Sequence, residues 1–272
     1  MLLDTLLEVQ DLKKYFPIKR GFREMFQKRE QFVKAVDGVS FTLERGKVLV
    51  LAGESGSGKT TVARLVMRAI EPDSGSILFE GSDIAHYAGS QLKNFRTRVH
   101  MVYQDPYASL NPRMKIMDIV MEPLNIHDKR SSRAEKEEKV LKALQDVRLE
   151  PALEIAAKLP HMLSGGQRQR VSLARAIVMQ PALIVADEPV SMLDVSVRGE
   201  ILEMMQRLKE KFRISYIYIT HDLSTARYIG NDLAVMRDGK IVEIGPIDEV
   251  LLNPSHGYTR ALIDAIPDPA KV

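Results

Sequence analysis

The chain has 272 residues, of which 45% are hydrophobic, so it can bury a sizeable core, and this argues against disorder as its main state. Lysine and arginine number 39 against 36 acidic residues, and the net charge of +3 gives no sign of nucleic acid or an anionic lipid surface as a partner. The chain has no cysteine, which excludes disulfides and thiolate metal sites.

The first residues, Met1-Leu2-Leu3-Asp4, lack the basic segment of a secretory signal. No run of about 18 apolar residues occurs along the chain, which is the length needed to cross a bilayer. We therefore expect neither a signal peptide nor a membrane span, and we expect any membrane role to come through a partner.

Two short alternations of apolar and polar residues, 7–10 and 39–43, predict strands of a small antiparallel sheet. Between them, residues 17–34 carry six basic and two acidic side chains. This basic segment is either a solvated loop or a basic contact surface, and the sequence does not decide between the two.

Residues 47–52 form a mostly continuous apolar run, which predicts a strand buried on both faces of a parallel sheet. A glycine-rich loop follows, and a helix is predicted after it over residues 61–67. Strand, glycine loop and helix are the context in which this pattern binds phosphate, because glycine lets successive N–H groups point inward at a helix N-terminus. The predicted nucleotide-binding residues are Gly53, Glu54, Ser55, Gly56, Ser57, Gly58, Lys59, Thr60 and Thr61.

Three side chains of this loop have specific predicted roles. Lys59 would reach the outer phosphates of a nucleoside triphosphate. Thr60 would ligate Mg²⁺ through its hydroxyl, and Thr61 would contact the α-phosphate.

Residues 91–164 are charged and helical in composition, and Arg133 with Glu137 makes an i,i+4 pair of opposite sign. We predict one domain over residues 1–272. Its nucleotide-binding core comprises residues 1–90 and 165–250, its inserted helical subdomain residues 91–164, and its C-terminal extension residues 251–272.

Two further buried strands are predicted at residues 182–186 and 214–220, each after a helix, as in a parallel sheet. Apolar segments at 233–236 and 240–244 flank Asp238-Gly239, which predicts a hairpin with a two-residue turn. The predicted fold class is α/β: a P-loop NTPase parallel-sheet core with a small antiparallel β subdomain and an inserted helical subdomain.

Asp187 and Glu188 follow the strand at 182–186 and should lie at the same sheet edge as the glycine loop. In isolation, two acids after a strand could equally form a solvated turn. With Lys59 upstream, we expect Asp187 to hold Mg²⁺ through its waters and Glu188 to polarise the water that attacks the γ-phosphate.

Residues 163–170 read LSGGQRQR, and with the glycine loop and the acidic pair they resemble the ATPase subunits of ABC transporters. The resemblance implies that ATP and Mg²⁺ are bound and that this signature covers the γ-phosphate held by another subunit. The signature residues are Ser164, Gly165, Gly166 and Gln167. A simpler role of Ser164 as a helix N-cap would leave most of the string unexplained.

The same resemblance assigns roles to isolated side chains. It implies that Gln104 reaches Mg²⁺ and that His221 contacts the γ-phosphate. Residues 191–194 resemble the D-loop of the family. The aromatic that stacks on adenine is expected at Phe16, with Tyr15 as the alternative, and either ring could instead belong to the core.

Residues 103–113 and 253–260 narrow the resemblance to the peptide and nickel importer group. Met162 and Met192 depart from it, since Glu and Ala are usual there. The implied function is ATP hydrolysis that powers import of peptides or similar small solutes, at the cytoplasmic face of the membrane. The implied partners are a second ABC ATPase subunit, transmembrane permease subunits and, indirectly, an extracytoplasmic solute-binding protein, without nucleic acid.

The main alternative is an ABC ATPase that acts on nucleic acid or the ribosome. Such proteins typically carry a long coiled coil, zinc cysteines or two ATPase domains, and the sequence shows none of these. A P-loop kinase or switch protein is a second alternative, which the signature argues against. The transported solute, and whether the ATPase pair is a homodimer or a heterodimer, do not follow from the sequence.

Overall fold

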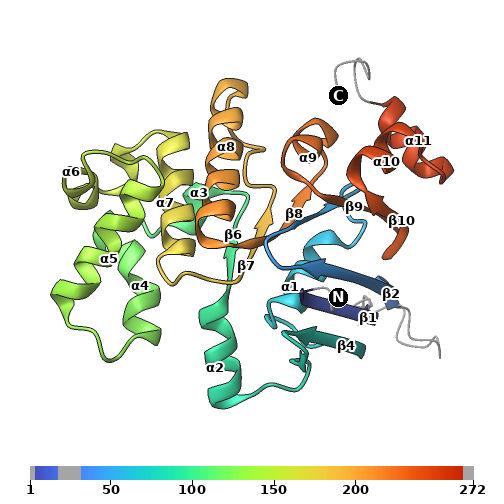
Figure 1. Cartoon of the computed structure of the whole chain (residues 1–272), viewed down its shortest axis with the longest axis horizontal. Coiled ribbons are helices and arrows are strands. Elements are labelled where there is room, and N and C mark those ends of the chain that lie inside the picture. Colours follow the sequence, from blue (N-terminus) through green and yellow to red (C-terminus); the bar gives the residue numbers. More distant parts are fainter. Residues whose placement is uncertain (1–3, 18–31, 266–272) are drawn as a thin grey trace, which may run out of the picture.

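The computed structural model describes residues 4–17 and 32–265, and within them a six-stranded sheet forms the centre of the molecule (Figure 1). Its order is β10-β9-β3-β8-β7-β6; neighbours from β9 to β6 are parallel, and β10 is antiparallel to β9. The strands are β3 (Val48–Ala52), β6 (Val99–Val102), β7 (Leu183–Asp187), β8 (Ser215–Thr220), β9 (Asp232–Arg237) and β10 (Lys240–Pro246). The predicted parallel strands and the hairpin are confirmed.

The side chains of the central strands alternate between two hydrophobic cores, because successive residues of a strand point to opposite faces of the sheet. In β3, Val48, Val50 and Ala52 belong to one core, and Leu49 and Leu51 belong to the other. All five are at most 1% exposed. The run is therefore apolar throughout because neither face of β3 meets solvent.

A four-stranded antiparallel sheet in the order β2-β1-β4-β5 covers the second core. Its strands are β1 (Thr5–Pro17), β2 (Phe32–Glu44), β4 (Ser74–Phe79) and β5 (Ser82–Asp83). The predicted pairing is confirmed, with Leu7 opposite Leu43. Residues 18–31 of the basic segment lie outside the described residues, so its two interpretations stay open.

The helices α3 to α7 gather on one side of the sheet and form the helical part of the molecule (Figure 1). They are α3 (Pro106–Ser109), α4 (Ile116–His127), α5 (Arg133–Asp146), α6 (Ala152–Ala157), a 3-10 turn (Pro160–Met162) and α7 (Gly165–Ile177). Helix α2 (Gly89–Arg98) precedes β6, and its buried Phe95 belongs to the second core. One strand departs from the predicted helical range 91–164, since β6 lies within it and pairs with β7 of the central sheet. Four residues are too few for periodicity to separate a strand from a helix.

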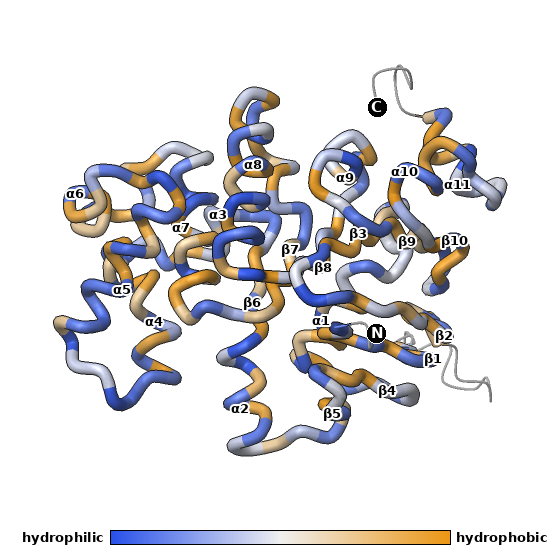
Figure 2. The backbone as a smooth tube through the Cα atoms, viewed as in Figure 1, coloured by the Kyte–Doolittle hydropathy of each residue, from blue (hydrophilic) through white to orange (hydrophobic). Residues whose placement is uncertain are grey.

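The remaining helices are α1 (Lys59–Val66), α8 (Val195–Phe212), α9 (Leu223–Ile229), α10 (Ile247–Leu252) and α11 (Gly257–Asp264). Hydrophobic and hydrophilic residues are interspersed along the helices (Figure 2). Among the described residues, no helix combines the length and the apolar character needed to cross a membrane. The last two helices continue from β10, and α10 packs against the β9–β10 hairpin.

Candidate nucleotide-binding site

The glycine-rich loop lies between the end of β3 and the start of α1. Gly53, Gly56 and Gly58 have φ values of 146°, 83° and 108°, which other residues rarely adopt. A Cβ atom on Gly53 would lie 2.2 Å from the carbonyl oxygen of Met236, and one on Gly58 would lie 2.2 Å from that of Ala35. Neighbouring backbone therefore requires glycine at both positions.

Lys59 is buried against the loop it follows. Its ammonium group donates to the carbonyl oxygens of Gly53 and Glu54 at 2.7 Å each, and to the Ser57 hydroxyl at 3.3 Å. Burial lowers the pKa of Lys59, and the nearby carboxylates of Glu188 and Asp187 act in the opposite direction. A desolvated cation on carbonyl acceptors is suited to exchange them for phosphate oxygens.

Thr60 and Asp187 are brought together from α1 and the end of β7. The Thr60 hydroxyl donates to Oδ2 of Asp187 at 3.1 Å. Burial raises the pKa of Asp187, and the hydrogen bond from Thr60 partly offsets this. A hydroxyl beside a carboxylate is the oxygen donor set that Mg²⁺ takes in nucleotide sites, so these residues fit the predicted ion.

The carboxylate of Glu188 lies between the side chains of Gln104 and His221. The Gln104 side-chain amide donates to its Oε2 at 3.1 Å, and Nδ1 of His221 lies 3.0 Å from its Oε1. Glu188 also has a φ of 47°, which costs a non-glycine residue about 1–3 kcal/mol. Its backbone N–H donates to the Ile219 carbonyl, so β8 holds this conformation in place.

A cavity of about 800 Å³ joins these groups. Six of its lining residues were not predicted as site residues: four belong to β2 and two to the β9–β10 turn. The lining comprises Phe32, Val33, Lys34, Ala35, Ser55, Gly56, Gly58, Lys59, Thr60, Thr61, Gln104, Asp187, Glu188, His221, Asp238 and Gly239. Sequence reasoning recognised the Asp238-Gly239 turn but had no signal that placed it beside the glycine loop.

The two candidate adenine-stacking aromatics lie at the end of β1. The Tyr15 hydroxyl donates to Oδ1 of Asp37 at 2.5 Å, so this side chain is already engaged. Phe16 is 40% exposed and lies opposite Val33, a residue of the cavity wall, although Phe16 itself does not line the cavity. The ammonium group of Lys14 lies 5.8 Å from the centroid of the Phe16 ring. The role of Phe16 stays a prediction.

The signature residues lie at the start of α7, away from this cavity. Ser164 accepts a hydrogen bond from the Gln167 backbone, and Gln167 accepts one from the Ser164 backbone, which forms a capping box. Gly166 packs on α8, where a Cβ atom would lie 2.6 Å from a methyl group of Val197. None of the four residues, including Gly165, lines the cavity beside Lys59.

Comparison with known proteins decides the family. The pattern of the ABC transporter family matches residues 36–191, and that of the oligopeptide/dipeptide transporter C-terminal region matches residues 242–272. The chain belongs to the ABC transporter family. It is an ATP-binding cassette, and ATP hydrolysis coupled to transport is the activity of the family.

Curated relatives of this cassette include the oligopeptide transport ATP-binding protein AppF of Bacillus subtilis, 46% identical over 97% of this chain and 79% of the relative. The dipeptide transport ATP-binding protein DppF of Escherichia coli is 44% identical over 98% of this chain and 78% of the relative. An ATP-binding cassette solved as a dimer in a post-hydrolysis state, bound to ADP and Pi, is 25% identical with a TM-score of 0.76, covering 89% and 98% of the two chains. These relatives give no support to action on nucleic acid or the ribosome.

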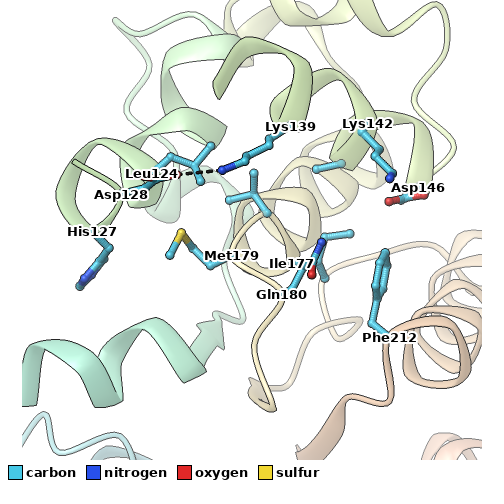
Figure 3. A pocket seen from close by; sticks show the side chains of 12 residues that line it. Leu124, His127, Asp128, Lys139, Lys142, Asp146, Ile177, Met179, Gln180 and Phe212 are labelled. Atoms are coloured by element: carbon cyan, nitrogen blue, oxygen red, sulfur yellow. Dashed lines mark hydrogen bonds and ion pairs between the residues drawn. The ribbon is translucent and has the colours of Figure 1, made fainter. Parts of the chain in front are cut away.

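A second cavity of the cassette, about 400 Å³, lies among α4, α5 and the C-terminal ends of α7 and α8 (Figure 3). Its acidic side chains Asp128 and Asp146 already have basic partners, Lys139 at 2.8 Å and Lys211 at 2.5 Å. It contains none of the predicted nucleotide-binding residues. The second cavity is therefore separate from the cavity beside Lys59.

Proposed function

We propose that this chain is the ATP-hydrolysing subunit of a transporter that imports peptides or similar small solutes. The observation that carries the proposal is the position of Glu188, whose carboxylate lies between Gln104 and His221 in the cavity that Lys59 and Asp187 also line. The names of the relatives, which are peptide transport proteins, supply the solute class.

Six residues of the cavity have a proposed part in hydrolysis. Lys59 exchanges the loop carbonyls for the outer phosphates of ATP. Glu188 accepts a hydrogen bond from the attacking water and orients it. His221 contacts the γ-phosphate from the other side of Glu188. Thr60, Asp187 and Gln104 hold Mg²⁺, which supplies charge neutralisation to the phosphates when bound.

The signature completes the site of another subunit. Ser164 and Gln167 form hydrogen bonds with each other in the capping box, and Ser164 at the N-terminus of α7, the positive end of the helix dipole, is exposed. Such a helix end suits an anion brought by a second molecule. The partner is a second ABC ATPase subunit, either a copy of this chain or a related one.

The cassette binds a permease subunit at the cytoplasmic face of the membrane, as a peripheral subunit of the transporter. We propose that it docks in a groove of about 340 Å³ between β6 and α4, whose walls include the exposed side chains of Tyr103 and Ile126. Tyr103 directly precedes Gln104, so movement of a docked permease would reach the amide that contacts Glu188.

The test is transport by the assembled complex. The chain would be purified with the permease and the second ATPase subunit that accompany it and reconstituted into vesicles. ATP would be supplied on the cassette side, and the solute-binding protein with radiolabelled dipeptides or Ni²⁺ on the other side. Uptake of dipeptide in step with phosphate release, lost in Lys59→Ala, is expected. Phosphate release without uptake of any peptide, or ATP-driven uptake of Ni²⁺ only, would overturn the proposed solute class.

A further inference from the structure

The C-terminal region of the chain reaches the glycine-rich loop through one side chain. Tyr258, near the start of α11, is 8% exposed, and its hydroxyl accepts a hydrogen bond of 3.2 Å from the backbone N–H of Glu54. The two residues are 204 positions apart. The region matched by the oligopeptide/dipeptide transporter pattern is therefore in direct contact with the loop that holds phosphate.

This hydrogen bond acts on a peptide group that Lys59 also holds. The carbonyl oxygen of Gly53 and the N–H of Glu54 belong to the same peptide unit. Lys59 donates to that carbonyl oxygen at 2.7 Å, and the hydroxyl of Tyr258 accepts from that N–H on the other side. The orientation of the unit is thus set from both ends.

The Tyr258 ring is itself fixed by the neighbouring hairpin and loop. The guanidinium of Arg237, at the end of β9, lies 4.8 Å from the ring centroid. The backbone N–H of Tyr258 donates to Nδ1 of His256. The segment before it is anchored on β10, because Glu243 accepts hydrogen bonds from Ser255 and His256.

We infer that Tyr258 is a positioning residue for the glycine-rich loop, which keeps the Gly53–Glu54 peptide in its phosphate-binding orientation. The inference rests on the proposed role of this loop in holding the phosphates. When Lys59 turns from the Gly53 carbonyl to a phosphate, the Gly53–Glu54 peptide loses one of its two hydrogen bonds. The hydroxyl of Tyr258 remains, so the loop does not have to reorganise as the nucleotide enters.

The direct test is Tyr258→Phe, which removes the hydroxyl but retains the ring beneath Arg237. Because one hydrogen bond contributes about 0.5–1.5 kcal/mol, we expect the Kd of the full chain for a fluorescent ATP analogue to rise about 3- to 10-fold. In the assembled transporter, the KM for ATP should rise by the same factor while kcat changes less than about twofold, since Glu188 and its partners are untouched. The thermal midpoint without nucleotide should fall only slightly, by about 2–4 °C for each kcal/mol lost, because the bond is also present without nucleotide.

Tyr228→Phe is the matched control, since Tyr228 is a half-exposed tyrosine of α9 that does not line the cavity, and it should leave the Kd and KM for ATP unchanged. Unchanged Kd and KM in Tyr258→Phe would overturn the inference, as would a fall in kcat or thermal midpoint without a rise in KM. Lys59→Ala separates this from failure of the proposed function. If Lys59→Ala binds the analogue as well as the wild type, the loop does not hold the phosphates at all.

Discussion

The cavity beside Lys59 and the signature at the start of α7 are built in opposite ways. Glu188 depends on side chains from distant parts of the chain, since it meets both Gln104 and His221. Ser164 and Gln167 satisfy each other within three residues. The fold assembles the first site within one molecule, whereas the second is a local helix end that is complete without a ligand and is available to one from outside.

The largest effect is expected from Lys59→Ala, which should weaken ATP binding by about 100-fold or more, because hydrogen bonds to a charged group contribute about 1.5–3 kcal/mol each. Titration of the isolated chain with a fluorescent ATP analogue measures this. Lys139→Ala is the control, since Lys139 pairs with Asp128 in the helical part, and it should leave the affinity unchanged. Equal losses of affinity in both variants would show that Lys59 has no specific role in ATP binding.

An intermediate effect is expected from Ser164→Ala, which should leave ATP affinity of the isolated chain within about twofold of the wild type but lower hydrolysis by the assembled transporter about tenfold. The substitution also removes a helix cap, which costs about 1 kcal/mol of stability.

Ser132→Ala controls for the cap, because Ser132 and Glu135 form the same capping box at the start of α5. Its thermal midpoint should fall as in Ser164→Ala, with hydrolysis unchanged. If both variants lost hydrolysis equally, the signature would be acting through stability alone.

The elements around the nucleotide site were largely predictable because their signals are local. The glycine loop sits between an apolar strand and a helix, and Asp187 follows another apolar strand, so the rule for sheet edges places both together. The capping box at Ser164 is likewise a contact between neighbours.

Contacts between segments far apart in the sequence could not be predicted, because no local sequence pattern indicates them. The approach of Ala35 to Gly58 and the hydrogen bond from Glu54 to Tyr258 depend on how whole elements pack, which no periodicity encodes. The prediction included β6 in the helical range 91–164. This strand has four residues, which are too few for hydrophobic periodicity to separate a strand from a helix. The roles of Phe16, Gln104 and His221 came from the family resemblance and remain predictions.

The smallest effect, on thermal stability, is expected from loss of the Glu243 carboxylate, which accepts hydrogen bonds from the C-terminal region. Burial opposes ionisation of Glu243, but the hydrogen bonds that it accepts from residues 255–259 outweigh burial and lower its pKa from 4.5 to about 2. The ionised carboxylate therefore stabilises the fold fully above pH 4.5, and this contribution is lost as the pH falls toward 2.

Thermal unfolding of wild type and Glu243→Gln should show this. The wild type should have the higher midpoint at pH 6–7, by about 2–4 °C for each kcal/mol in a chain of this size, and the difference should shrink below pH 4.5. Glu249→Gln on α10, an exposed residue of the same region, is the control and should leave the midpoint near that of the wild type. A gap that persisted down to pH 2 would contradict the assigned anchor.

The central claim is that one chain holds half of the catalytic machinery and that ATP joins it to a second subunit. Sedimentation of Glu188→Gln with ATP and Mg²⁺, alone and mixed with the other ATPase subunit of its transporter, tests this most directly. The amide should preserve ATP binding but nearly abolish hydrolysis, so a dimer should accumulate, and adding Ser164→Ala should weaken it. A Glu188→Gln chain that binds ATP but stays monomeric at all concentrations, with and without the partner, would contradict the claim.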